Sequence, residues 1–91
     1  MANQRNFEKD PQATLDFAVD WTDWLESDTI STGTWIVPSG IVKVSSSYTT
    51  VKDTVFLASG TVDNTYAVIN RITTANGKKN DQTIYILVKD Q

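Results

Sequence analysis

The chain of 91 residues contains no cysteine and no histidine. Without cysteine it can form no disulfide, and without histidine it lacks the commonest general base and the commonest transition-metal ligand. No apolar run approaches the roughly 20 residues that span a bilayer, and residues 1–11 are too charged for a signal peptide. These absences predict no catalytic residues, no cofactor, no metal and no membrane contact. They also predict a protein kept in the cytosol unless a larger assembly carries it outside.

The length fits one domain, and a chain this short buries only roughly 60–65% of its unfolded surface, which leaves no room for a deep cleft. The net charge of −3 is spread unevenly. Residues 1–36 hold seven acidic and two basic residues, for −5, and residues 37–91 hold four acidic and six basic residues, for +2. This pattern fits either ordinary solvated strand faces or an acidic and a basic side that could meet copies of the chain. The sequence contains no dense basic patch, so it does not predict binding to nucleic acid.

Apolar and polar residues alternate with a period of two along much of the chain, which indicates half-buried strands. We expect strands at residues 15–21, 29–37, 41–44, 48–57, 66–74 and 81–89, and a short edge strand around Phe7. The only helical candidate is residues 22–27, which Asp20 or Thr22 could cap. About seven short strands separated by turn sequences predict an all-β, immunoglobulin-like β-sandwich with antiparallel strands.

The inward positions of these strands predict one core between two sheets. Trp35 and Tyr66 match the core tryptophan and the corner tyrosine of immunoglobulin-like domains, and Trp21 continues the buried side of its strand. The predicted core consists of Leu15, Phe17, Val19, Trp21, Trp35, Val37, Val55, Leu57, Val68, Ile72, Ile84, Ile86 and Val88.

Four residues are candidates for a protein interface. Trp24 and Leu25 fall in the connection after the first long strand, where they either plug the end of the sandwich or form an exposed anchor. Arg71 points outward, as a cross-strand ion-pair partner or an interface anchor. Ile69 is an apolar residue on an exterior face and marks a contact surface.

The acidic residues of the first third could in principle form a calcium site or a glycosidase pair. Calcium takes six to eight oxygen ligands, and the order of these acids fits no calcium loop. A glycosidase needs a cleft around its two carboxylates, for which the chain has no room. The acids in question are Asp16, Asp20, Asp23, Glu26 and Asp28.

Several segments together resemble small virion proteins of tailed bacteriophages, of the fiber–tail adaptor type. The segments are DPQATLDFAVDWTDWL at residues 10–25, DTIS at 28–31, TWIV at 34–37 and NRITT at 70–74, followed by Gly77. The resemblance covers about residues 10–90, and it departs from the family at residues 58–60 and at Ile69. It implies an immunoglobulin-like fold, a non-enzymatic structural role and a place in the virion after synthesis in the host cytoplasm.

The resemblance also implies partners, namely other copies of the chain and tail, neck or fibre proteins. We expect a flexible arm at residues 1–10, a single domain at 11–91, and a head-to-tail ring of copies. The arm, Trp24, Leu25, Ile69 and Arg71 would supply most contacts. The alternatives are a capsid decoration protein and a carbohydrate-binding module, which would need an aromatic platform of Trp24 with Tyr48 or Tyr85.

Overall fold

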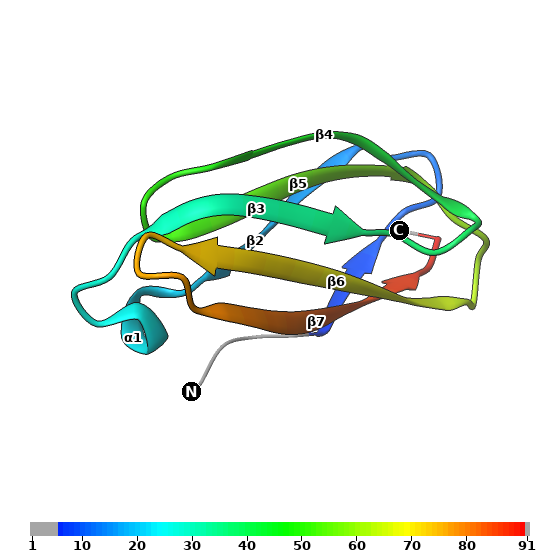
Figure 1. Cartoon of the computed structure of the whole chain (residues 1–91). Helices are drawn as coiled ribbons and strands as arrows, with labels where there is room; N and C mark the ends of the chain where they lie inside the picture. The colour runs from blue at the N-terminus through cyan, green and yellow to red at the C-terminus, as the bar shows by residue number, and fades with distance from the viewer. Residues whose placement is uncertain (1–5, 91) are drawn as a thin grey trace.

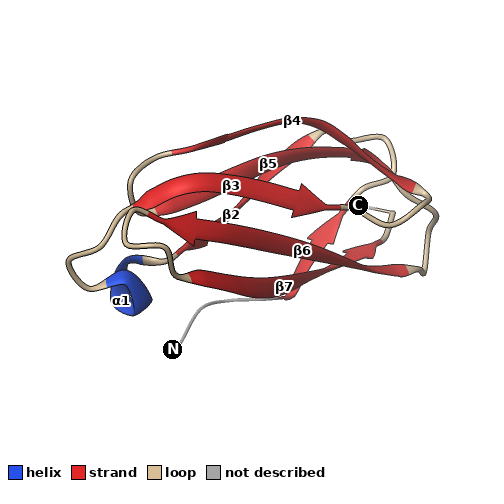
Figure 2. Cartoon of the chain, in the orientation of Figure 1, coloured by secondary structure: helices blue, strands red, loops and turns tan. Residues whose placement is uncertain are grey.

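A computed structural model describes residues 6–90 as two facing β-sheets with one short helix at an end of the sandwich (Figures 1 and 2). The fold is therefore all-β and immunoglobulin-like, as the sequence predicted. The elements are β1 (Asn6–Lys9), β2 (Leu15–Asp20), α1 (Thr22–Leu25), β3 (Ile30–Ile36), β4 (Ile41–Tyr48), β5 (Lys52–Ser59), β6 (Thr65–Thr74) and β7 (Lys79–Val88). Within residues 6–90 no helix has the length and apolarity that crossing a membrane requires.

One sheet has four strands in the order β1-β7-β6-β3, and the other has three in the order β2-β5-β4. All neighbours pair antiparallel except β1, which pairs parallel with β7. This arrangement places Trp35 on the third strand and Tyr66 near the start of the sixth, where the immunoglobulin template has its core tryptophan and its corner tyrosine. The Tyr66 hydroxyl accepts a hydrogen bond from the Thr61 backbone N–H at 2.9 Å.

Two boundaries differ from the sequence prediction. The strand expected to fade after residue 44 continues through the three serines to Tyr48, because backbone pairing with β5 needs no apolar side chain. The next strand therefore begins at Lys52 and not at Tyr48. The chain reverses at residues 49–51, where the Thr49 hydroxyl accepts the Lys52 backbone N–H at 3.2 Å.

The first residues also differ from the prediction of a flexible arm. The edge strand predicted around Phe7 is present as β1, at the edge of the four-stranded sheet. Residues 1–5 lie outside the described residues, so the structure contradicts the predicted arm only at residues 6–9. Phe7 packs edge-to-face on Phe17 with ring centroids 5.2 Å apart. Lys9 is fully buried, and its Nζ donates to the carbonyl oxygens of Ser59 at 2.6 Å and Asp10 at 2.8 Å. Its burial lowers the pKa of this lysine.

The core lies between the sheets. Of the thirteen predicted core residues, eleven are buried and Val37 is partly buried against them. Leu15 was predicted wrongly, because it is the first residue of an edge strand and is 40% exposed. Four further apolar side chains complete the buried cluster: Leu25, Ile30, Ile41 and Tyr66.

Candidate protein interface

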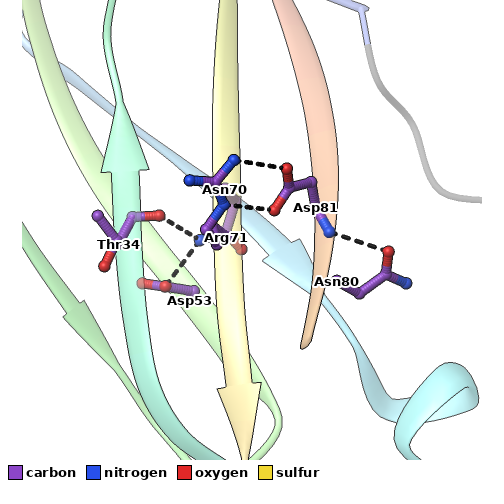
Figure 3. A network of polar contacts seen from close by, with 6 residues as sticks. All are labelled: Thr34, Asp53, Asn70, Arg71, Asn80 and Asp81. Carbon is purple, nitrogen blue, oxygen red and sulfur yellow. Dashed lines mark hydrogen bonds and ion pairs between the residues drawn. The ribbon is translucent and has the colours of Figure 1, made fainter. Parts of the chain in front are cut away.

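Strand β6 crosses the middle of the four-stranded sheet and carries Ile69 and Arg71 on its outer side and Asn70 between them on its inner side. Asn70 is fully buried. Its Oδ1 accepts from Trp21 Nε1 at 2.8 Å. Its Nδ2 donates to Asp53 Oδ2 at 2.8 Å and to the Thr34 carbonyl at 3.2 Å, and Figure 3 shows these two bonds. These bonds fix the centre of the strand, and so they fix which side chains its outer side presents.

Asp53 on β5 is the other centre of this buried network. Its Oδ1 accepts from Trp35 Nε1 at 3.0 Å, so Asp53 and Asn70 together use the ring N–H of two core tryptophans. A buried carboxylate is costly unless it is hydrogen-bonded, and here both oxygens are. Asp53 and Asn70 were not predicted from the sequence, although both occupy inward positions. Asp53 lies two residues before Val55, and Asn70 lies two residues after Val68.

On the outer side of the four-stranded sheet, Arg71 and Asp81 form a two-pronged ion pair. Arg71 Nε lies 2.8 Å from Asp81 Oδ1, and its Nη2 lies 3.0 Å from Oδ2 (Figure 3). The pair lowers the pKa of Asp81 and raises that of Arg71, in both cases chiefly through these hydrogen bonds. The side chains are 53% and 44% exposed, so the pair adds little stability. Its effect is to hold a planar guanidinium in place on the outer face.

Apolar side chains cross the same face and form what we call the outer stripe. The register places Ile36 directly opposite Ile69, and Ala67 directly opposite Tyr85. Ile36 and Tyr85 are 40% and 43% exposed, Ala67 is exposed and Ile69 is half-buried. The outer stripe therefore consists of Ile36, Ala67, Ile69, Tyr85 and the half-buried Leu87.

A shallow hollow of about 250 Å³ lies at the end of the outer stripe, beside the parallel pair of β1 and β7. It is smaller than the pockets of about 300–1,000 Å³ that hold small-molecule ligands. Its lining is mixed, with apolar and aromatic surface next to one carboxylate. The residues around it are Asn6, Phe7, Glu8, Thr65, Tyr85 and Leu87.

The two other predicted contact residues lie elsewhere, on α1 at the end of the sandwich (Figure 1). Leu25 is only 4% exposed and belongs to the core, so the contact expected of it is wrong. It is buried because the helix folds back over the open end between the sheets. Trp24 is half-buried and packs edge-to-face on Trp21, with centroids 5.5 Å apart. The structure thus brings Ile69 and Arg71 together on one face and places Trp24 and Leu25 apart from them.

The structure offers no support for a calcium site, a glycosidase pair or a carbohydrate-binding platform within residues 6–90. No group of three or more acidic side chains in residues 6–90 is placed to hold a metal ion. Asp20 instead accepts the backbone N–H of Thr22 at 2.9 Å and its hydroxyl at 2.5 Å, and these bonds lower its pKa. Trp24 lies on α1, Tyr48 on β4 of the three-stranded sheet and Tyr85 on β7 of the four-stranded sheet.

Residues 9–87 match the family described as podophage GP4 fiber-tail adaptor protein gp77. The chain belongs to this family. The resemblance seen in the sequence is thereby confirmed, and it covers all of β2 through β6 and most of β7. No curated protein matches the chain.

A solved structure supports the fold of this adaptor-family member. The chain is similar to the solution structure of the PKD domain from KIAA 1837 protein, with a TM-score of 0.57, and covers 97% of its own length and 81% of that chain. The two sequences are only 13% identical, so the likeness concerns the fold alone.

Proposed function

We propose that this chain is a non-enzymatic structural subunit of a bacteriophage virion, an adaptor that joins the tail or neck to the fibres. The match to the fiber-tail adaptor family over residues 9–87 carries the proposal. The description of the family as a fiber-tail adaptor supports a role in joining fibres to the tail.

The outer face of the four-stranded sheet is the surface through which we expect the subunit to be built into the particle. It carries exposed apolar side chains, with the held guanidinium of Arg71 beside them and the carboxylate of Glu8 toward one end. An apolar centre with a polar rim is typical of protein interfaces, and Tyr and Arg are over-represented among the residues that contribute most binding energy.

Assembly into the particle tests the proposal directly. A phage lacking the gene would be complemented with the wild-type chain or with Ala67→Asp, which adds a charge to the centre of the face. Ala18→Asp is the matched control, because Ala18 is also exposed on a strand but belongs to the three-stranded sheet. We expect particles with fibres from the wild type and Ala18→Asp, and particles without fibres from Ala67→Asp. Absence of the wild-type chain from purified particles would refute the function.

A further inference from the structure

Two charged side chains stand at opposite ends of the outer face without an ion-pair partner. Glu8 on β1 lies beside Leu87, near the end of β7, and Lys79 is the first residue of β7. Both are exposed, and within residues 6–90 neither forms an ion pair. The face therefore carries an unpaired carboxylate toward one end and an unpaired ammonium toward the other, with the outer stripe between.

The two ends are equally far from the middle of the face. Thr83 lies four residues after Lys79 and four before Leu87, and Ile69 is directly opposite Thr83 on β6. At about 3.3 Å per residue, each end is roughly 13 Å from this midpoint. Consider two copies whose outer faces lie against each other. A two-fold axis that runs between the faces at this level, perpendicular to the strands, places each end of one face against the opposite end of the other. It sets each Lys79 against the other copy's Leu87 and Glu8.

We propose that the outer face of the four-stranded sheet binds the same face of a second copy, with a two-fold axis at the level of Ile69 and Thr83. The two Ile69 side chains meet at the axis. Each Lys79 lays its methylene stem over the hollow beside Leu87 and directs its ammonium to Glu8 of the other copy, as long basic side chains commonly do at interfaces. The ring of Tyr85 meets the guanidinium of Arg71, a contact that is favourable over an aromatic face.

The size of the face sets the strength of the pairing. The four strands β1, β7, β6 and β3 hold 4, 10, 10 and 7 residues, 31 in all. With about 4.8 Å between strands and about 3.3 Å per residue, they cover roughly 500 Å². Two such faces bury at most about 1,000 Å², which is the size of a weak interface. The pair therefore forms weakly in solution, and fully at the high local concentration of an assembled particle.

The inference rests on the proposed function for its premise that this face carries an assembly contact. It adds that a second copy of the chain binds there. A two-fold pair also turns both three-stranded sheets outward, in opposite directions. This contact is isologous and differs from a head-to-tail ring, in which unlike surfaces meet.

A charge exchange tests the pairing with the purified chain. Sedimentation equilibrium would be recorded from about 5 μM to about 1 mM, a range in which weak pairs associate. We expect wild-type mass to rise toward that of a dimer. Glu8→Lys and Lys79→Glu should each weaken association at least about tenfold, because each sets like charges together. The double variant Glu8→Lys/Lys79→Glu should restore it, since unlike charges meet again.

The control variant is Asp16→Lys, which changes a charge on the outer side of the three-stranded sheet and should leave the dimer intact. Circular dichroism would verify that every variant is folded. A chain that stays monomeric at about 1 mM, or one whose association ignores both single variants, overturns the proposal. A dimer that forms but is absent from virions would refute the adaptor function and leave the interface standing.

Discussion

The carboxylate of Asp53 lies against the α-carbon of Gly33, so close that a Cβ atom at residue 33 would overlap Asp53 Oδ2. Gly33 belongs to β3 and Asp53 to β5, which are strands of different sheets. The absence of a side chain at Gly33 is what lets the carboxylate enter the core and accept hydrogen bonds from Trp35 and Asn70. The two residues therefore form one structural unit.

Gly33→Ala should destabilise the fold, although alanine is normally better than glycine in a strand interior. The added methyl group must displace Asp53, and we expect a loss of about 2–3 kcal/mol in the free energy of unfolding. Urea denaturation measures it. In the background of Asp53→Ala the same change should cost little, because the clashing oxygen is gone. An equal cost in both backgrounds would contradict the coupling.

Asp53→Asn should also be destabilising, despite its nearly identical shape. An amide can accept from Trp35, but it turns an N–H₂ group toward the Asn70 N–H₂ donor. We expect a cost of about 2–3 kcal/mol in urea denaturation. Exchanging the two groups, as Asp53→Asn with Asn70→Asp, should recover part of the loss because donor and acceptor face each other again. No recovery would show that the bond between them contributes little.

Period-two alternation was sufficient to predict the sandwich and nearly all of its core, because each long strand has one face in the core and one outside. It also put Ile69 and Arg71 on one exterior face. It failed at the serines of β4, since a uniformly polar run carries no alternation. It failed as well for Leu25, because a four-residue helix is too short to show which side is buried.

The rest of the interface depends on contacts between distant parts of the chain. Glu8 shares a face with Lys79 only because β1 pairs parallel with β7, and no local pattern specifies that pairing. The link between Asp53 and Asn70 likewise joins strands of different sheets. A polar residue at an inward position of an alternating strand indicates that a buried hydrogen-bond partner exists. It does not indicate which residue that partner is.

Tyr66→Phe should cost about 1 kcal/mol, because the Thr61 backbone N–H loses its acceptor in the corner between β5 and β6. Thermal or urea denaturation detects a change of this size. Tyr85→Phe is the matched control, since its ring is 43% exposed on the outer face. If both variants lost the same stability, the corner hydrogen bond would have no special role.

Lys9→Met should change how stability depends on pH at the alkaline end. Burial lowers the pKa of Lys9 in the folded chain, whereas the unfolded chain keeps its proton up to about the ordinary value of 10.5. Between the lowered pKa and 10.5 the unfolded state binds more protons, so the free energy of unfolding of the wild type rises with pH. Lys9→Met removes this rise, and Lys89→Met, at an exposed position, keeps it. Urea denaturation at several pH values up to 10.5 provides the comparison. Equal pH slopes for the wild type and Lys9→Met would show that the ammonium is solvated in the folded chain.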